Sequence, residues 1–215
     1  MSKSDYFDRK IKNLFTQKVK SYLFDIIYFF NIFAKPFHYL KRVNNIYDNR
    51  IINMGCGATY IKGWINVDGN PLRKKDLWLD VRCKWPFRAG TIKGIVASHL
   101  IEHLYDDELS IFFSQLKRAI KKDGFVHLEV PSLEILIENY RKNNNGVMFN
   151  EVCFWHGAHR QVFDFGRLEQ LLSNAGLEVK FHIFGEKKSH FLNTAEVDEI
   201  CLRPEQSIIV EAVKL

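Results

Sequence analysis

The 215-residue sequence predicts an α/β fold with an open, mostly parallel sheet. Short apolar runs alternate with stretches of helical apolar periodicity along most of the chain, a pattern typical of a sheet covered by helices. The first run breaks at Gly55-Cys56-Gly57 and is followed by a second run that ends on Asp68. A glycine turn followed by an acid at the next strand end is typical of nucleotide-binding α/β folds.

Composition and charge indicate one ordinary globular domain with a basic N-terminal arm. The chain is 47% hydrophobic and 26% charged, with a net charge of +6. Residues 1–50 carry ten basic and four acidic side chains, whereas residues 51–215 carry 21 of each. Because the second part is charge-neutral, the basic balance gives no support for a nucleic-acid groove there. We therefore divide the chain into residues 1–49 and 50–215.

Cysteine usage and hydropathy favour a cytoplasmic protein. The four cysteines, Cys56, Cys83, Cys153 and Cys201, form no CxxC pair, which fits a reducing compartment. No apolar run reaches the ~18 residues that a membrane-spanning helix needs. We expect a cytoplasmic protein that is soluble or peripheral at the inner face of the membrane.

The N-terminal arm is basic, aromatic and helical in pattern. Apolar residues recur with helical period over residues 10–20, and residues 22–34 are almost wholly apolar between basic flanks. Two interpretations stay open. The arm is a lid on the catalytic domain, or residues 10–42 contact an anionic membrane. Nothing in the sequence indicates the oligomeric state.

The first two strands frame a predicted ligand site. We assign residues 50–54 and 64–67 to strands joined by the glycine turn. Gly55 and Gly57 let the backbone bend and let a ligand lie against peptide N–H groups. Asp68, at the tip of the second strand, is placed to accept hydrogen bonds from a ribose diol. The next glycine, Gly63, comes too late for a GxGxxG dinucleotide fingerprint.

The middle of the chain continues the alternation. Residues 76–80 are predicted to form a third strand that ends on Asp80, and residues 92–98 a central fourth strand. A helix is expected from Asp106 to a stop at Gly124, with the fifth strand over residues 125–130. Because ligands bind at the carboxyl ends of strands, the polar residues after the fourth strand should face the reactive end of the ligand. These are Ser98, His99, Glu102 and His103.

The C-terminal part is predicted to finish the sheet with an antiparallel hairpin. Residues 133–150 begin as a helix and dissolve into a loop at 143–146. A helix follows Asp164 and ends at Gly176. Residues 177–183 and 207–213 are the two final strands, and the charged segment 184–204 between them is expected to be a mobile connector.

The ordered series NMGCG, GWINVD, LD, WPF, ASHLIEHL and LKRAIKKDGFVHLEVPSLE resembles the type-11-like predicted methyltransferases of polysaccharide and lipid modification, within the class I S-adenosylmethionine-dependent enzymes. The resemblance covers roughly residues 51–215. It implies a Rossmann-like seven-stranded sheet, mostly parallel with an antiparallel last strand, and S-adenosylmethionine as cofactor. It also implies that the acceptor is a sugar hydroxyl on a nucleotide-linked or lipid-linked saccharide.

The same resemblance assigns the cofactor contacts. Asp80 and the backbone N–H of Val81 would recognise the adenine edge, and a neutral amide, Asn53, stands where many related enzymes carry an acid. The segment from His159 to Asp164 would lie above the methyl group. The predicted cofactor-binding residues are Asn53, Gly55, Cys56, Gly57, Asp68, Asp80, Val81, Ser98 and His99.

Methyl transfer to a hydroxyl requires a group that accepts the proton, and histidine suits that role near neutral pH. His99 is the first choice because it follows the fourth strand, and His159 is the second because of its loop. His103 and His156 are further candidates, and Glu102 and Asp164 are orienting carboxylates. Each also has a structural interpretation: Glu102 and His103 as braces of the next helix, and Asp164 as an N-cap.

Four other interpretations compete with this one. Cys153, His156 and His159 stand at three-residue steps, but no paired motif supports a metal site, so none is predicted. A quinone or other lipid methyltransferase would need an apolar acceptor pocket. A non-catalytic S-adenosylmethionine-binding scaffold finds its one hint in Asn53. Nucleic-acid methylation is disfavoured because the Asn/Asp-Pro-Pro-Tyr/Phe signature is lacking.

Overall fold

The computed structural model describes residues 26, 45–143, 146–154 and 158–215. The predicted arm at residues 1–49, with its lid and membrane-contact interpretations, lies almost wholly outside the described residues. Within the described ranges, no helix has both the length and the apolar character needed to cross a bilayer.

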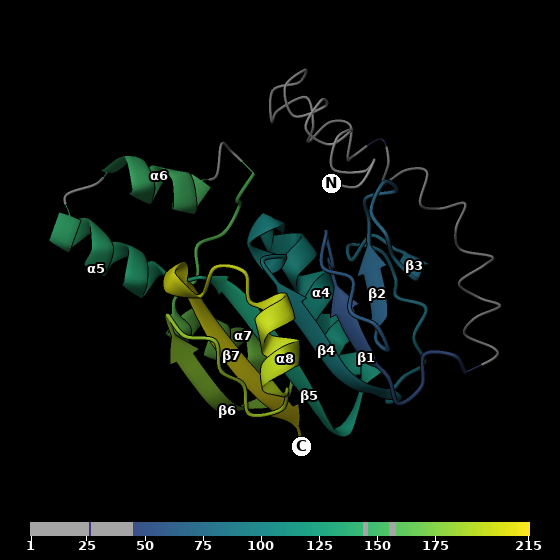
Figure 1. The fold of residues 1–215 in the computed structure, drawn as a ribbon. Helices are drawn as coiled ribbons and strands as arrows, with labels where there is room; N and C mark the ends of the chain where they lie inside the picture. Colours follow the sequence, from purple (N-terminus) through teal and green to yellow (C-terminus); the bar gives the residue numbers. More distant parts are fainter. Residues whose placement is uncertain (1–25, 27–44, 144–145, 155–157) are drawn as a thin grey trace.

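A seven-stranded sheet in the order β3-β2-β1-β4-β5-β7-β6 forms the centre of the domain (Figure 1). The first five strands pair in parallel, and β7 is antiparallel to both of its neighbours. This confirms the predicted Rossmann-like sheet. The strands are β1 Ile51–Met54, β2 Ile65–Asp68, β3 Leu77–Trp78, β4 Ile92–Ser98, β5 Ile120–Pro131, β6 Leu177–Phe184 and β7 Ser207–Lys214.

Helices cover both faces of the sheet. Helices α4 and α7 pack on one face and the short helix α8 packs on the other (Figure 1). The helices are α4 Asp106–Ala119, α5 Leu133–Asn143, α6 Gly146–Phe154, α7 Phe165–Asn174 and α8 Thr194–Ile200, with 3-10 turns η2 Ile101–His103 and η4 Pro204–Gln206. The helix predicted to begin at residue 133 is α5, and the second helix, α6, was not predicted.

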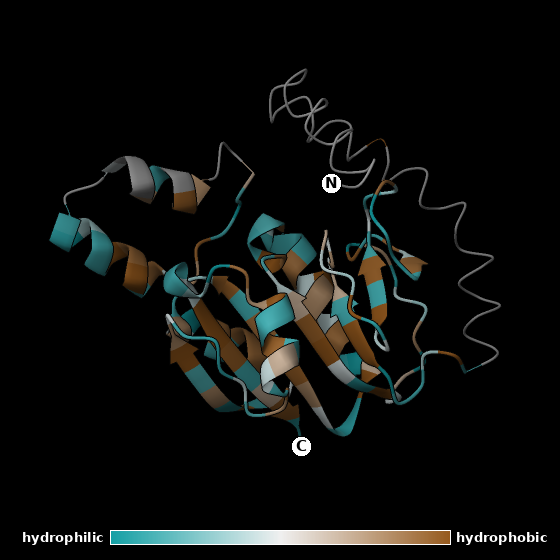
Figure 2. Cartoon of the chain, viewed as in Figure 1, coloured by the Kyte–Doolittle hydropathy of each residue, from teal (hydrophilic) through white to brown (hydrophobic). Residues whose placement is uncertain are grey.

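The two faces bury separate apolar cores, and the strands between them are apolar along most of their length (Figure 2). Below α4, the rings of Trp85 and Phe112 meet edge to face with centroids 5.3 Å apart. Below α8, Val96 and Phe125 of the sheet pack against Val197. Central strands buried on both faces explain the near-continuous apolar runs of the sequence.

The predicted end of α4 at Gly124 is wrong. The helix ends at Ala119, and Ile120 already has an extended backbone, with ψ 135°. Strand β5 starts at Ile120, which pairs with Ile92, and the register shifts before Gly94 pairs with Phe125. Residues 121–124 form the intervening bulge. A Cβ on Gly124 would lie 2.9 Å from the carbonyl oxygen of Lys121, so the glycine serves the bulge.

The expectation of a connector over residues 184–204 is corrected by the presence of α8. Asn193 caps this helix by accepting the N–H of Glu196 at 3.0 Å, while the Glu196 carboxylate accepts the N–H of Asn193. The helix has only seven residues, too few for helical periodicity to stand out. Val197 and Ile200 are buried and close the smaller core.

Candidate active site

The carboxyl ends of the parallel strands lie along one edge of the sheet (Figure 1). The glycine turn follows β1 there, Asp68 ends β2, and Ser98 and His99 stand at the end of β4. The topology therefore gathers the predicted cofactor residues and the predicted catalytic residues at one edge, as expected for ligand sites in open α/β sheets.

The glycine turn is shaped by two left-handed residues. Gly55 has φ +66° and Gly57 has φ +54°, a region that side chains rarely adopt. A Cβ on Gly55 would lie 2.7 Å from Cδ1 of Leu100. Because Leu100 directly follows His99, the turn packs against the segment that carries the catalytic candidates.

Asp68 is held in place by the turn itself. Its Oδ2 accepts the N–H of Gly57 at 2.7 Å, and its Oδ1 accepts the N–H of Asn70, also at 2.7 Å. Each carboxylate oxygen has a second lone pair. The carboxylate is thus oriented by the backbone and retains acceptor capacity for a ligand hydroxyl.

Cys56 and Asn53 form hydrogen bonds that stabilise the glycine turn. The N–H of Cys56 donates to the carbonyl of Val67 at 2.9 Å, and burial raises the pKa of its thiol to about 12, so the thiol is neutral. The Asn53 amide nitrogen donates to the carbonyl of Thr59 at 2.9 Å and to Oδ1 of Asn66 at 3.2 Å. A contact of either residue with the cofactor stays a prediction.

Asp80 and Val81 lie beside the tip of β2. A Cβ on Gly69, the residue after Asp68, would lie 3.6 Å from Cα of Asp80. The Asp80 carboxylate accepts the N–H of Arg82 and forms an ion pair with its guanidinium at 2.8 Å. The Val81 side chain is buried in the larger core. Asp80 thus lies beside the residue that follows Asp68, and the adenine contact of Asp80 and Val81 stays a prediction.

Glu129, near the end of β5, is a site residue that the sequence reasoning missed. It is fully buried, and its carboxylate accepts the Ser98 hydroxyl at 2.5 Å and the Cys201 thiol at 3.0 Å. Burial disfavours its charge, yet hydrogen bonds from His99, Cys201 and Ser98 hold the pKa of Glu129 below its usual value. The sequence does contain a signal for this residue, because an acidic side chain inside the apolar run of residues 125–130 is unusual in a buried strand.

His99 is held as a cation by its surroundings. Its Nδ1 lies 3.1 Å from Oε1 of Glu102, and its Nε2 lies 3.2 Å from the Ser207 hydroxyl, which itself donates to a carbonyl. Burial disfavours the charged ring, but Glu102 and Glu129 raise the pKa of His99 to about 9. A ring that donates both N–H groups has no lone pair for a proton, which weighs against His99 as the base.

His103 and His159 meet although they are far apart in sequence. Their rings lie edge to face with centroids 4.9 Å apart. The Nδ1 of His103 lies 3.1 Å from the carbonyl oxygen of Ala158, and the Nδ1 of His159 lies 2.6 Å from that of Val152. Since a carbonyl only accepts, both rings carry the proton on Nδ1. Burial, the largest effect, lowers the pKa of His159, so its ring is neutral.

The backbone fixes the segment that carries His159. The N–H groups of Arg160 and Gln161 both donate to the carbonyl of Glu102, at 2.7 and 3.0 Å. Glu102 is only 1% exposed, and its Oε2 has no hydrogen-bond partner within the described ranges. One carboxylate oxygen of Glu102 and one ring nitrogen each of His103 and His159 lie within 4.8 Å of one another. We call these three residues the His-Glu cluster.

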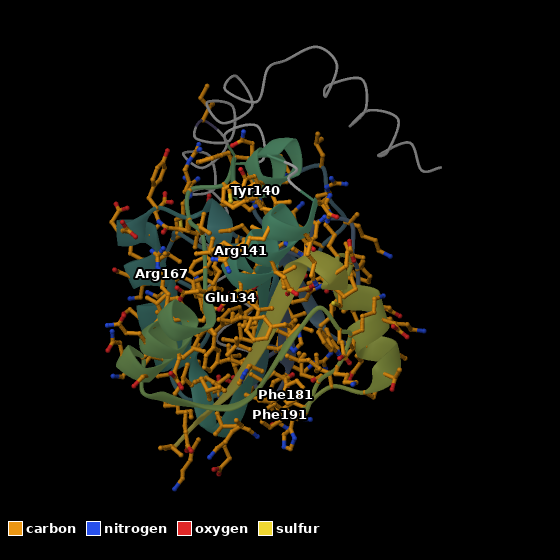
Figure 3. All side chains as sticks on the ribbon, turned by 90° about the vertical axis from the view of Figure 1, so that its left-hand side faces the viewer. Glu134, Tyr140, Arg141, Arg167, Phe181 and Phe191 are labelled. Carbon is orange, nitrogen blue, oxygen red and sulfur yellow. The ribbon has the colours of Figure 1, made fainter. Side chains whose placement is uncertain are left out.

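Asp164 has the structural role that was considered for it. Its carboxylate caps α7 by accepting the N–H of Arg167 at 2.7 Å. Glu134, at the start of α5, accepts the N–H of Phe165 at 2.8 Å and so joins α5 to α7. Figure 3 marks Glu134 and Arg167 on these helices. The cap confirms the structural interpretation of Asp164.

The remaining metal-ligand pattern is not assembled by the described residues. Cys153 is buried near the end of α6, and burial raises the pKa of its thiol. His156 lies outside the described residues.

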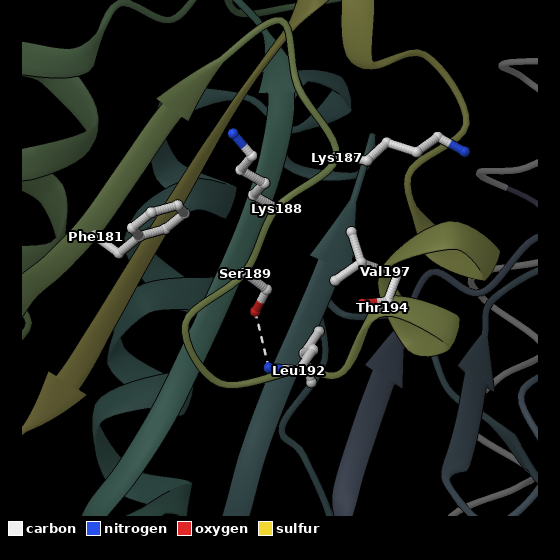
Figure 4. A pocket seen from close by; sticks show the side chains of 7 residues that line it. All are labelled: Phe181, Lys187, Lys188, Ser189, Leu192, Thr194 and Val197. Atoms are coloured by element: carbon white, nitrogen blue, oxygen red, sulfur yellow. Dashed lines mark hydrogen bonds between the residues drawn. The ribbon is translucent and has the colours of Figure 1, made fainter.

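A separate pocket of about 220 Å³ lies between β6 and α8 and is lined by residues from both and from the segment between them (Figure 4). It shares no lining residue with the His-Glu cluster.

Solved structures with the same fold are methyltransferases. An S-adenosylmethionine-dependent methyltransferase from Archaeoglobus fulgidus is 19% identical, with a TM-score of 0.53 over 87% of this chain and 100% of that chain. A possible histamine N-methyltransferase from Thermotoga maritima is 18% identical, with a TM-score of 0.52 over 87% and 94%. An S-adenosylmethionine-dependent methyltransferase from Methanosarcina mazei is 16% identical, with a TM-score of 0.52 over 80% of this chain and 97% of that chain.

Sequence comparison gives the family. No curated protein matches the chain significantly. A family model described as a methyltransferase domain matches residues 28–180, which is most of the chain and includes the glycine turn, Asp68 and the His-Glu cluster. The chain therefore belongs to this methyltransferase-domain family and is a methyltransferase.

Proposed function

We propose that the protein is an S-adenosylmethionine-dependent O-methyltransferase that methylates a sugar hydroxyl of a nucleotide-linked or lipid-linked saccharide in surface-glycan biosynthesis. The observation that carries the proposal is the packing of Leu100 against Gly55, because Leu100 lies in the segment that leads from β4 into the His-Glu cluster. When bound, the cofactor supplies a methyl carbon made electrophilic by its sulfonium.

The residues at the strand ends contact different parts of the cofactor. Asp68 accepts the ribose hydroxyls, because the backbone already orients its carboxylate. The glycines at 55 and 57 leave the backbone of the turn bare of side chains, and Asp80 lies beside Gly69, the residue that follows Asp68, which supports the adenine contact inferred for Asp80 and Val81. Ser98 and His99 close the reactive end. These roles follow the family resemblance and agree with the positions of the residues at one edge of the sheet.

The acceptor's proton is handled by the His-Glu cluster. His159 is neutral because burial lowers its pKa, and its Nδ1–H is engaged by a carbonyl, which leaves the lone pair on Nε2. His103 has the same tautomer. His99 is a positioning residue: its charged ring orients Glu102, which lies at the base of the cluster.

Polar side chains around the cluster favour a saccharide acceptor. The Arg160 guanidinium lies 5.1 Å from the centre of the Tyr105 ring, and Gln161 donates to Asp106 at 3.1 Å. Such groups match sugar hydroxyls, whereas a quinone pocket would be walled by apolar side chains. If the acceptor is lipid-linked, contact of residues 10–42 with the cytoplasmic face of the membrane would bring the enzyme to it.

Cofactor binding is the first prediction to test. Calorimetric titration with S-adenosylmethionine and S-adenosylhomocysteine should give micromolar binding, and NAD should give none. Asp68→Asn keeps the shape of the side chain but removes its charge, and we expect at least roughly tenfold weaker binding, the loss of one charge-assisted hydrogen bond. Asp198→Ala, at an exposed site on α8, is the matched control and should bind as the wild type does.

Acceptor identity is tested next, by mass-spectrometric detection of methyl transfer. Sugar nucleotides, lipid-linked sugars and quinone precursors are presented in parallel to the same enzyme. Methylation in either sugar arm supports the proposal. Methylation of the quinone alone would replace it with a lipid methyltransferase, and cofactor binding without transfer to any acceptor would favour a scaffold. Absence of cofactor binding by folded protein would overturn the function as a whole.

A further inference from the structure

We propose that Glu102, His103 and His159 bind a divalent transition-metal ion at the carboxyl end of β4. This departs from the expectation, drawn from the sequence, that the chain has no metal site. The three ligand atoms lie within 4.8 Å of one another. Metal bonds of about 2.0–2.2 Å would bring such atoms to roughly 3–4 Å apart, which small side-chain rotations achieve.

Both histidines are oriented as metal ligands are. In each ring Nδ1 donates to a backbone carbonyl, of Ala158 for His103 and of Val152 for His159. A metal-bound histidine almost always donates its other N–H to such an outer acceptor, which fixes the tautomer and directs the Nε2 lone pair at the ion.

Glu102 supplies the independent observation. Its Oε1 is held by His99 at 3.1 Å, while its Oε2 is buried without a hydrogen-bond partner among the described residues. A buried carboxylate oxygen without a partner is costly. A cation between Oε2 and the two imidazoles would satisfy it, and His99 would then act as the outer hydrogen-bond donor to the carboxylate.

The backbone preorganises the three ligands. Glu102 and His103 are adjacent in η2, and the segment with His159 is tied to the same turn by two N–H groups that donate to the Glu102 carbonyl. The distances among the ligands are thus set by main-chain hydrogen bonds. A site that forms without ordering a loop loses little entropy when the ion binds.

Ligand chemistry selects the class of ion. Two imidazole nitrogens with one carboxylate suit Zn²⁺, Mn²⁺, Fe²⁺ or Co²⁺, whereas Mg²⁺ and Ca²⁺ prefer sites built from oxygen. Three protein ligands leave coordination positions for a substrate oxygen, as in catalytic zinc sites.

The role of the ion in transfer rests on the proposed function. On an ion held by the cluster, the acceptor hydroxyl would take an open position, its pKa would fall and its proton would pass to solvent, so that the two histidines would act as ligands in place of the base role proposed above. The oxygen then attacks the sulfonium methyl: the O–C bond forms as the C–S bond breaks, and its electron pair stays on sulfur. The products are the methyl ether and the neutral thioether S-adenosylhomocysteine.

Metal binding is tested on the full-length protein after dialysis against a chelator. Co²⁺ is titrated with visible absorption as the readout, and Zn²⁺ and Mg²⁺ are titrated by calorimetry. The variants are His103→Ala, His159→Ala and Glu102→Gln. His190→Ala, which removes an exposed histidine elsewhere, is the matched control. Thermal melting of each metal-free variant establishes that it is folded.

The expected result is binding of about one Co²⁺ with absorption typical of nitrogen and oxygen ligands, and Zn²⁺ bound far more tightly than Mg²⁺. Affinity should fall at least roughly tenfold in the three cluster variants and stay unchanged in His190→Ala. No binding, equal binding in all proteins, or absorption from cobalt–thiolate bonds would overturn the site.

The same samples separate this proposal from the proposed function. S-adenosylmethionine is titrated into metal-free and metal-loaded protein. Metal binding without cofactor binding would leave the site standing and overturn the methyl-transfer function. Full methyl transfer by metal-free enzyme would overturn the catalytic role of the ion and leave the histidines as the base.

Discussion

At Gly55, backbone conformation and a neighbouring side chain constrain the residue independently. Gly55→Ala places a methyl group at φ +66° and 2.7 Å from Leu100. Gly63→Ala meets the same backbone penalty at φ +92° with no atom within 4 Å. We expect both to lower the free energy of unfolding by about 1–2 kcal/mol. Only Gly55→Ala, by displacing Leu100, should also reduce cofactor affinity and turnover.

Denaturant unfolding and calorimetry of both variants provide the measurement. Equal loss of cofactor affinity in the two would mean that the position of Leu100 does not matter. The comparison isolates the contact between the glycine turn and the segment that carries His99.

Single residues were predictable from sequence where their requirement is local. Gly55 and Gly57 have the positive φ that their turn suggested, and Asp68 stands at the predicted strand tip. The meeting of His103 with His159 could not be derived, because it depends on backbone hydrogen bonds between the Glu102 carbonyl and a distant loop. The spacing of residues along the chain does not indicate such a contact.

Helix α7 begins at an N-cap that also ends the segment bearing His159. Removing the carboxylate in Asp164→Ala exposes an unsatisfied N–H at Arg167 and should cost about 1 kcal/mol of stability, within the usual range for caps. Ser173→Ala, at an exposed position in the same helix, should leave stability unchanged or slightly raise it. Urea unfolding checks both, and equal losses would contradict the capping role.

Elements with strong periodicity were predictable, and those shaped by tertiary contacts were not. The start of α4 at Asp106 and the two final strands were predicted close to where the structure has them. The start of β5 at Ile120 was not predicted because pairing with Ile92 overrides the helical pattern of the preceding residues. Helix α8 was not predicted because its two buried residues, Val197 and Ile200, are too few to show helical periodicity.

Across the whole domain, a buried carboxylate couples stability to pH. Glu211 of β7 faces His127 of β5, with Oε1 and Nδ1 2.7 Å apart, and it also accepts the N–H of His190 at 2.6 Å. Burial disfavours the charge, but the His127 contact and the other donors hold the pKa of Glu211 below its usual value. The stability it contributes is present above about pH 4.5 and is lost as pH falls through the folded-state pKa.

We therefore expect Glu211→Gln to lower the free energy of unfolding at pH 7 by about 1–3 kcal/mol. The difference from wild type should shrink as the pH falls below about 4.5, because the Glu211 carboxylate of the unfolded chain is protonated there while that of the folded protein is still charged. Urea unfolding at several pH values measures it. Glu178→Gln, at an exposed site on β6, is the control. A difference that does not change with pH would contradict the assignment.

The position of β7 between β5 and β6 has a consequence for synthesis (Figure 1). Strand β6 leaves the ribosome before the strand that joins it to the sheet, and about 20 residues including α8 separate the two. Until β7 is inserted, both β5 and β6 present unpaired backbone edges, which other nascent chains can pair with. The order of translation therefore makes these two strands the part of the domain for which chaperones matter most.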